Sequence, residues 1–300
     1  MSIGLVYRSL VADDFKVLRI IEKGLYSREY VPLSFIEKYS GIYEEKLELV
    51  LSKLHRLRLV KRETVQGEKA FRLTYLGYDM LAIRDLAIKG VIDAIGDKIG
   101  TGKESEIYLA LAPGNVQVAV KFLRLGRTSF RQTRRTRSWL RDQRLSWYMQ
   151  SRVAAEREIL ALRELSKYES AFVPKPHGYD RHVVVIEYID GLELYRRPDL
   201  SQPDKVLHNI LSTISLAYHK PGIVHGDLSE YNVLIRKQDE TPFIIDWPQY
   251  IYKDNPFSSD LLRRDVYYIV KFFNRVYKLN IDPAKALSNV VNGCLLIDKT

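Results

Sequence analysis

A short segment in the last quarter of the chain constrains its fold more than any other part of the sequence. Two polar residues, Asp227 and Asn232, lie five positions apart. A second aspartate, Asp246, follows Asn232 by fourteen residues and ends an apolar run. The apolar segments 233–235 and 243–245 lie between them and are expected to form a hairpin. That hairpin would bring Asn232 and Asp246 together.

This set of polar residues predicts phosphoryl transfer from a magnesium-bound nucleotide. Mg²⁺ prefers oxygen ligands, which the amide of Asn232 and the carboxylate of Asp246 can supply. Asp227 can orient the attacking hydroxyl or accept its proton, which is the role of a catalytic base. On its own, His-Gly-Asp could be a turn with a capping aspartate. The asparagine and the second aspartate argue against that simpler interpretation.

A lysine inside an apolar strand, Val-Ala-Val-Lys-Phe, is the second signal. A charged group in such a strand is costly unless it is paired, so phosphate oxygens and a helix carboxylate are expected to contact Lys121. Glu156 is the first candidate for that carboxylate, because it shares a helical face with Ile159 and Leu160. Glu158 is the alternative. Otherwise Lys121 would be an edge-strand lysine whose ammonium reaches solvent.

Two further segments are expected to contact a nucleotide. In the turn from Gly100 to Ser105, the glycines would let backbone amides approach phosphate oxygens. The turn lacks the G-x-x-x-x-G-K-[ST] pattern, which excludes a P-loop. The apolar strand that ends at Glu187 suits a hinge whose backbone binds adenine, although an ordinary core strand is the alternative. The candidate ATP-binding residues are Gly100, Gly102, Lys103, Glu104, Ser105, Lys121, Glu156, Glu187 and Ile189.

The first 84 residues follow a different pattern. Apolar residues recur at helical spacing within 15–21 and 47–57. The period then changes to that of two strands joined by Gln66 and Gly67. Helices followed by a small hairpin predict a winged helix-turn-helix domain, which contacts either a phosphate backbone or a protein. The candidate nucleic-acid contacts in this domain are Lys53, Arg56, Arg58, Lys61 and Arg62.

The predicted fold class is α+β, with a winged helix-turn-helix domain before a second domain whose motifs resemble those of protein kinases, a resemblance that implies a truncated, bilobal fold. The predicted limits are 1–84 for the winged helix, 85–92 for a connecting helix and 93–300 for the kinase-like domain. Within that domain the expected limits are about 93–186 for the N-lobe, 187–191 for the hinge and 192–300 for the C-lobe.

Composition bounds the class of protein. Lysine and arginine number 47 against 37 acids, a net charge of +10, which favours anionic partners such as nucleic acid. The first residues lack the apolar centre of a signal peptide, and no run approaches the roughly 18 apolar residues of a membrane helix. We therefore expect a soluble, cytoplasmic protein. The single cysteine, Cys294, excludes an internal disulfide and is expected to be buried.

Together, these motifs resemble the protein-kinase fold over about residues 90–300, and more narrowly the atypical RIO serine kinases. The sequence GTGKES, the sequence IDWPQ and the winged-helix N-terminus resemble the type 2 RIO subfamily. Gly226 replaces the arginine that usually precedes the catalytic aspartate, and Trp247-Pro248 replaces Phe-Gly. No Ala-Pro-Glu motif follows. An activation segment and peptide-binding helices are therefore expected to be missing.

The resemblance implies ATP with Mg²⁺, or Mn²⁺ as an alternative, together with serine autophosphorylation. It also implies a role in maturation of the small ribosomal subunit, with ribosomal RNA or a precursor particle as partner. In such proteins ATP turnover is thought to act as a switch, through a phosphorylated metal-binding aspartate that corresponds to Asp246.

Residues 124–144 hold eight arginines and one acid. This composition predicts a loop that binds ribosomal RNA and presents a hydroxyl to the γ-phosphate. We predict Ser129 as the autophosphorylation acceptor, and a solvated loop without function is the alternative. The candidate RNA contacts in this segment are Arg134, Arg135 and Arg137.

Two rival functions share parts of this pattern. Small-molecule phosphotransferases of the aminoglycoside or choline type also have H-G-D-x-x-x-x-N, but they usually carry an acidic C-terminal substrate pocket, whereas this C-terminus is not acidic. The other rival is a winged-helix nucleic-acid binder with a non-catalytic, kinase-like sensor. The presence of Lys121, Asp227, Asn232 and Asp246 argues against it.

Overall fold

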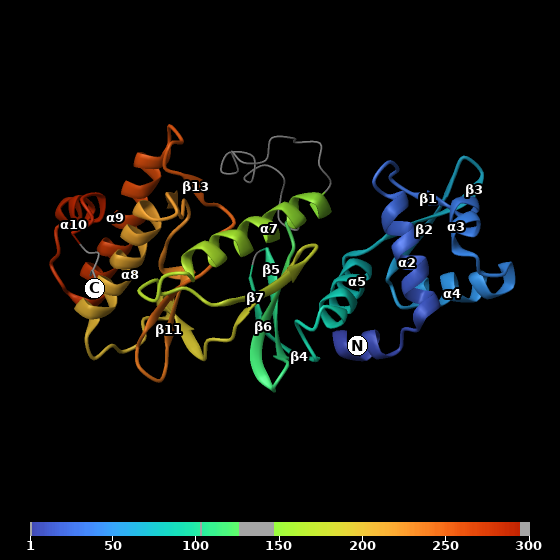
Figure 1. Ribbon diagram of the computed structural model, residues 1–300, viewed down its shortest axis with the longest axis horizontal. Helices are drawn as coiled ribbons and strands as arrows, with labels where there is room; N and C mark the ends of the chain where they lie inside the picture. The colour runs from blue at the N-terminus through green and yellow to red at the C-terminus, as the bar shows by residue number, and fades with distance from the viewer. Residues whose placement is uncertain (1, 103, 126–146, 295–300) are drawn as a thin grey trace. The chain divides into compact units, whose positions relative to one another are not determined.

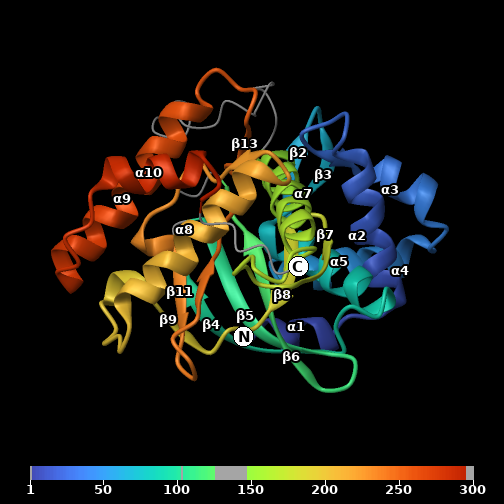
Figure 2. The same cartoon turned by 60° about the vertical axis from the view of Figure 1, so that its left-hand side comes forward.

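The computed structural model describes residues 2–102, 104–125 and 147–294, which Figures 1 and 2 show as ribbons. The chain forms two compact units. The first comprises residues up to 101 together with 106–116, and the second comprises 102–105 and the residues from 117 onward. The predicted domain limits near residues 84 and 93 stay a prediction.

The first unit begins with the winged helix-turn-helix that the sequence predicts. Its elements are α1 Ile3–Arg8, α2 Ala12–Gly24, β1 Val31–Pro32, α3 Leu33–Ser40, α4 Glu44–Arg56, β2 Val60–Val65 and β3 Glu68–Leu73. The three strands form a sheet in the order β1-β3-β2. Apolar faces of α2 and α4 supply its core, including the fully buried Leu18, Ile21 and Leu54.

Local sequence explains the boundaries of these elements. Gly41, with φ of 57°, ends α3 in the left-handed conformation that glycine adopts easily. Glu44 and Glu45 follow in the first turn of α4, where carboxylates stabilise the positive end of a helix. Gln66 and Gly67 have φ of 53° and 84°, the two positive values of a type I′ hairpin turn. The hairpin therefore forms where the sequence predicts it.

Three more elements complete the first unit. Helix α5, Tyr75–Ile88, follows the hairpin, and the side-chain oxygen of Thr74 caps it by accepting the backbone N–H of Gly77 at 3.2 Å. Strands β4, Ala94–Thr101, and β5, Ser105–Ala112, then pair antiparallel.

The second unit contains an antiparallel sheet covered by a long helix. Strand β6, Val116–Leu123, pairs with β8, Val183–Glu187, which pairs with β7, Pro176–Asp180. Helix α7, Trp147–Leu165, lies along this sheet (Figure 1). Small and apolar residues make this close packing possible. The residues that pack between the helix and the sheet are Leu123, Leu125, Ala154, Ala155, Ile159 and Val184.

The rest of the second unit is mainly helical. Its elements are β9 Gly191–Glu193, η1 Leu194–Arg196, α8 Pro203–His219, β10 Ile223–Val224, η2 Glu230–Asn232, β11 Val233–Arg236, β12 Pro242–Ile244, β13 Ile251–Tyr252, α9 Ser258–Tyr277 and α10 Pro283–Val291. Figure 2 shows α8, α9 and α10 packed together. Strands β12, β11 and β9 form a small sheet in that order. This sheet and the short elements around it carry the predicted catalytic motifs.

Two expectations from composition can be compared with the structure. No helix in the described part of the chain is long and apolar enough to cross a membrane. The expectation that Cys294 is buried was wrong, because the residue is exposed just beyond the end of α10.

Candidate active site

Lys121 is buried in β6 and is paired, as its place in an apolar strand predicts. Its side chain is 8% exposed, and its ammonium donates to both carboxylate oxygens of Glu158 at 2.7 and 2.9 Å. It also donates to Asp246 Oδ1 at 2.8 Å. Burial alone would lower the pKa of Lys121, but the carboxylates of Asp246 and Glu158 outweigh it and raise the pKa above its usual value. The lysine is therefore a fixed cation that can bind phosphate oxygens.

The helix partner of Lys121 is Glu158, so the first choice of Glu156 was wrong. Glu156 is exposed, whereas Glu158 is 1% exposed. A step of two residues turns a helical side chain by about 200°, so only one of the two can face the strand. The sequence prediction placed Leu160 on the buried face of the helix, whereas the structure shows that Leu160 is 45% exposed. The buried face was therefore assigned to the wrong side of the helix. The buried face consists of Tyr148, Ser151, Ala154, Ala155, Glu158, Ile159, Ala161, Leu162 and Leu165.

The loop between β10 and β11 carries the two other predicted polar groups. The amide nitrogen of Asn232 donates to the backbone carbonyl of Asp227 at 2.8 Å. Because the nitrogen makes this bond, the amide oxygen is the atom of Asn232 that can bind a cation. The same bond closes the loop, so that Asp227 and Asn232 are held in one rigid turn.

The hairpin of β11 and β12 brings Asn232 close to Asp246, as predicted. Val233 pairs with Ile244, and the backbone N–H of Ile245 donates to the carbonyl of Asn232 at 3.0 Å. Asp246 has φ of 67°, a left-handed conformation that few residues other than glycine adopt. Its side chain is 42% exposed. Strained backbone of this kind concentrates at functional sites, where the surrounding structure imposes it.

His225 links the loop that carries Asp227 and Asn232 to the backbone between β12 and Asp246. Its Nε2 lies 3.0 Å from the carbonyl oxygen of Ile245, so this nitrogen carries the proton and donates it. Nδ1 then accepts the backbone N–H of Asp227 at 3.3 Å. Burial is the main cause that lowers the pKa of His225, to about 4. The imidazole is therefore neutral near pH 7 and works as a structural link.

The residues that depart from the ordinary kinase pattern have local structural reasons. Gly226 has φ of 78°, and a Cβ there would lie 3.1 Å from the carbonyl oxygen of Gln249. An arginine at this position would be strained. Trp247 is fully buried, donates from Nε1 to the Ile244 carbonyl at 3.0 Å and packs its ring 4.6 Å from that of His225. It anchors the segment that follows Asp246.

Asp265 on α9 supports the loop that carries Asp227 and Asn232, and the sequence motifs did not indicate it. It is 1% exposed, and its two oxygens accept the backbone N–H groups of Gly226 at 2.8 Å and Leu228 at 3.2 Å. Burial raises the pKa of Asp265 to about 6, against the opposing effect of these hydrogen bonds. The signal was present in the sequence, because Asp265 occupies the apolar stripe that contains Leu262 and Ile269.

Arg157 on α7 is a second residue that sequence reasoning missed. Its Nε donates to the carbonyl of Pro248 at 2.8 Å, and its guanidinium also donates to the carbonyl of Tyr250. The guanidinium lies 4.2 Å from the centre of the Tyr250 ring. Since the next residue, Glu158, binds the buried lysine, one turn of α7 positions both the lysine and the segment after Asp246.

Comparison with known proteins shows which family has this combination of domains. The family model described as "RIO domain" matches residues 106–286, and the model described as "Rio2, N-terminal" matches residues 7–89. The chain belongs to the RIO kinase family. It is therefore an atypical serine/threonine protein kinase by family, as the motifs predict.

Relatives named Rio2 and a solved Rio2 structure agree with this family assignment, and they indicate the Rio2 branch of the family. The chain is 34% identical over 277 residues to the serine/threonine-protein kinase rio2 of Schizosaccharomyces pombe, covering 92% of this chain and 79% of the relative. It is 34% identical over 264 residues to the RIO-type kinase Rio2 of Methanocaldococcus jannaschii, covering 86% and 94%. The Rio2 kinase–ADP/Mg²⁺–phosphoaspartate complex from Chaetomium thermophilum has a TM-score of 0.80 at 29% identity, covering 97% of this chain and 93% of that one.

The oxygen donors of this RIO kinase fit Mg²⁺. Within the described residues, no group of three or more His, Cys, Asp or Glu could enclose a metal ion. Mg²⁺ does not need such an enclosure, because one or two protein groups usually hold it together with water and substrate phosphates. The amide oxygen of Asn232 and the carboxylate of Asp246, on adjoining backbone, form a pair of this type.

The turn from Gly100 to Ser105, which is predicted to cover the phosphates of the nucleotide, lies partly within the residues that the structure describes. Gly102 N–H donates to the carbonyl of Ser105 at 2.9 Å, and the carbonyl of Glu104 accepts a backbone N–H from just after β6 at 2.6 Å. A Cβ on Gly102 would lie 3.1 Å from Ser105 Oγ, so a side chain there would be crowded. Gly100 lies near the end of β4, in the other compact unit. Lys103 lies outside the described residues.

The predicted hinge of the RIO domain follows β8. Glu187 ends this strand, and both its backbone N–H and its carboxylate bond to the backbone of Lys175, at 2.8 and 3.1 Å. Ile189 is 8% exposed. Gly191 starts β9, where a Cβ would lie 2.5 Å from the carbonyl oxygen of Ile235. The chain is tightly constrained on both sides of the hinge, and its contact with adenine stays a prediction.

The cations predicted to contact nucleic acid are spread over different parts of the winged helix. Lys53 donates to Asp14 Oδ2 at 2.5 Å and to a backbone carbonyl at 2.7 Å, so its ammonium is engaged within the domain. Arg62 is the cross-strand partner of Phe71, and Lys61 faces the opposite side of the hairpin because side chains alternate along a strand. Arg56 and Arg58 are exposed. Ser129, Arg134, Arg135 and Arg137 lie outside the described residues.

Asp265 and His225 should affect stability in opposite directions between pH 4 and 6. The pKa of His225 falls from 6.5 to about 4 in the folded protein, so its contribution is lost as pH falls through this window. The pKa of Asp265 rises from 3.8 to about 6, so its contribution is present at low pH and is lost as pH rises. Each amounts to about 3 kcal/mol. In the wild type the two effects largely cancel.

Asp265→Asn removes one of these opposing effects. We therefore expect its free energy of unfolding to fall more steeply than that of the wild type as pH is lowered from 6 to 4. The measurement is urea unfolding at several pH values, followed by tryptophan fluorescence. Asp260→Asn, on the exposed side of the same helix, is the control and should keep the wild-type slope. An Asp265→Asn slope equal to that of the wild type would contradict the prediction.

Proposed function

We propose that this chain is an ATP- and Mg²⁺-dependent RIO kinase that phosphorylates itself and turns over ATP. We further propose that this turnover acts as a switch in maturation of the small ribosomal subunit. One observation carries the enzymatic part. Buried Lys121 bridges Glu158 and Asp246, while Asn232 and Asp227 lie on the adjoining loop. The Chaetomium relative, solved with ADP, Mg²⁺ and phosphoaspartate, supports the same cofactors here.

Each side chain then has a defined role. Lys121 binds the α- and β-phosphate oxygens, and Glu158 keeps its ammonium in place. Asn232 and Asp246 hold Mg²⁺, which when bound neutralises charge on the phosphates. Asp227 orients the attacking hydroxyl or water and accepts its proton. The turn at Gly102–Ser105 covers the phosphates, and the backbone from Glu187 to Ile189 binds adenine.

We propose two phosphate acceptors within the chain. In the first reaction, a carboxylate oxygen of Asp246 attacks the γ-phosphorus, the bond to the β-phosphate oxygen breaks, and ADP leaves. Water then hydrolyses the acyl phosphate, which restores Asp246 and releases phosphate, so the net reaction is ATP hydrolysis. In the second reaction, the hydroxyl of Ser129 is the acceptor. The phosphoaspartate of the Chaetomium structure supports the first route.

Radiolabelled ATP can separate these acceptors. Label on Asp246 should be removed by hydroxylamine, because acyl phosphates react with it, and should be missing in Asp246→Asn. Label on Ser129 should resist hydroxylamine and be missing in Ser129→Ala. Hydroxylamine-sensitive label that persists in Asp246→Asn would contradict Asp246 as the acceptor. Stable label that persists in Ser129→Ala would contradict Ser129.

The proposed partner is ribosomal RNA or a small-subunit precursor. Support comes from the net charge of +10, the arginines of residues 124–144 and the exposed cations Arg56, Arg58 and Lys61. The matches to both a RIO domain and a Rio2 N-terminal domain favour this function over the small-molecule phosphotransferase and the non-catalytic alternative.

A further inference from the structure

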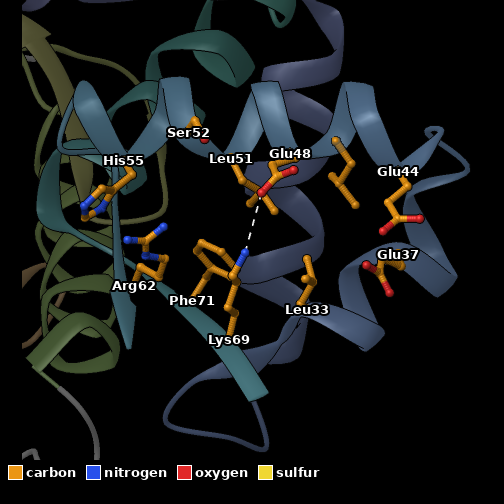
Figure 3. Close-up of a pocket in the computed structure, with 11 residues that line it drawn as sticks. Leu33, Glu37, Glu44, Glu48, Leu51, Ser52, His55, Arg62, Lys69 and Phe71 are labelled. Carbon is orange, nitrogen blue, oxygen red and sulfur yellow. Dashed lines mark ion pairs between the residues drawn. The ribbon is translucent and has the colours of Figure 1, made fainter. Parts of the chain in front are cut away.

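The winged helix contains a groove that the proposed ATP chemistry does not use. Figure 3 shows it with helix α4 along one side and the hairpin β2–β3 together with α3 along the other. A cavity of about 100 Å³ at its centre has room for an apolar side chain. The apolar residues that line it are Leu33, Leu47, Leu51 and Phe71.

The two ends of this groove carry opposite charges. Glu37 and Glu44 lie at one end, whereas Arg62 lies at the other end, with His55 beside it (Figure 3). Between the ends, Glu48 and Lys69 pair across the groove at 3.5 Å. Both of these side chains are more than half exposed, so the pair contributes little and can open for a ligand.

The exposed surface of α4 argues against nucleic acid as the ligand of this face. In a helix-turn-helix the second helix enters the DNA groove, close to phosphates. Here the first half of that helix carries Glu44 and Glu48 along the groove, and phosphates repel these carboxylates. The charges at the ends of the groove, together with a cavity lined by both polar and apolar side chains, fit a peptide.

We propose that this groove binds a short peptide segment of a partner protein. One apolar side chain of the segment enters the cavity. A lysine or arginine on one side of it pairs with Glu37 and Glu44, and an aspartate or glutamate on the other side pairs with Arg62. Opposite charges at the two ends also set the direction in which the segment lies. This binding is independent of the proposed ATP chemistry.

Peptide selection on the full chain tests this proposal. The probe is a library of random 12-residue peptides displayed on phage, and binding of the selected peptides is then measured by fluorescence anisotropy. We expect selected sequences to carry an apolar residue with a cation on one side and an acid on the other. Selection of no peptide, or of peptides without this charge pattern, would overturn the proposal.

Charge reversal shows whether the selected peptide lies in the groove. The double variant Glu37→Lys/Glu44→Lys should weaken binding roughly tenfold or more. Glu45→Lys, an exposed change outside the groove, should leave binding unchanged. A peptide whose cation is replaced by glutamate should bind the double variant better than the wild type, which also shows that the variant is folded. An unaffected double variant overturns the proposal, as does a 12-nucleotide RNA that displaces the peptide from wild-type protein.

Discussion

Replacing Asp227 with alanine should reduce phosphorylation of a hydroxyl and hydrolysis of ATP by about 10²- to 10⁴-fold, while ATP binds almost as tightly as before. The reason is that Asp227 is proposed to accept the proton of the attacking hydroxyl, and of the water that hydrolyses the acyl phosphate, which matters in the transition state and not in the bound ground state. The change leaves in place Lys121, proposed to bind the phosphates, and Asn232 and Asp246, proposed to hold Mg²⁺. Single-turnover rates and nucleotide titrations measure the two quantities separately.

Two companion variants refine the test of Asp227. Asp227→Asn keeps the size and hydrogen-bonding capacity of the side chain but cannot accept a proton, so it should lose nearly as much activity as the alanine variant. Asp254→Ala, an exposed change in the same unit, should keep wild-type rates. Activity of Asp227→Ala within a few-fold of the wild type would show that Asp227 is not the base.

Glu158→Gln has the second-largest expected effect, and Glu156→Gln is its matched control on the same helix. Within the described residues, the change leaves Asp246, at 2.8 Å, as the remaining carboxylate that accepts a hydrogen bond from the buried ammonium of Lys121. Removing one partner of a buried ion pair usually costs about 3–5 kcal/mol. Because Asp246 still compensates part of the charge, we expect a loss of about 2–3 kcal/mol in the free energy of unfolding.

The same change should also weaken ATP binding and turnover. Without Glu158, Lys121 is drawn to Asp246, the residue proposed to hold Mg²⁺, so we expect ATP affinity to fall by about tenfold. Glu156→Gln should change the free energy of unfolding by less than about 0.5 kcal/mol, since Glu156 is exposed. Denaturant unfolding and nucleotide titration measure both effects. If the Glu156 variant loses stability and the Glu158 variant does not, the assignment of the ion pair is wrong.

The features that could be predicted from sequence depend on residues close together in the chain. The spacing from Asp227 through Asn232 to Asp246 predicted the hairpin, and the structure confirms it through the pairing of Val233 with Ile244. The winged helix followed from the change between helical and strand period and from Gln66-Gly67. In each case, local backbone geometry and a tight turn leave few other arrangements.

The features that sequence reasoning missed depend on contacts between distant residues. Lys121 reaches Glu158 across 37 positions and Asp246 across 125 positions. Whether Glu156 or Glu158 meets the lysine depends on the rotation of α7 about its axis, and the packing of that whole helix on the sheet decides it. A shift of one or two residues in the assumed apolar face was enough to select the wrong carboxylate.

The sequence by itself therefore determined the family, the domain types and the polar groups proposed to carry out phosphoryl transfer. Only the tertiary structure decided which side chains support them. It showed Asp265 bonded to the backbone of the loop that carries Asp227 and Asn232, and it showed the ion pair of Lys53 with Asp14 within the winged helix. It also showed the groove beside α4. The physical reason is that periodicity specifies which face of an element is buried, whereas the partner that meets this face depends on how the elements pack.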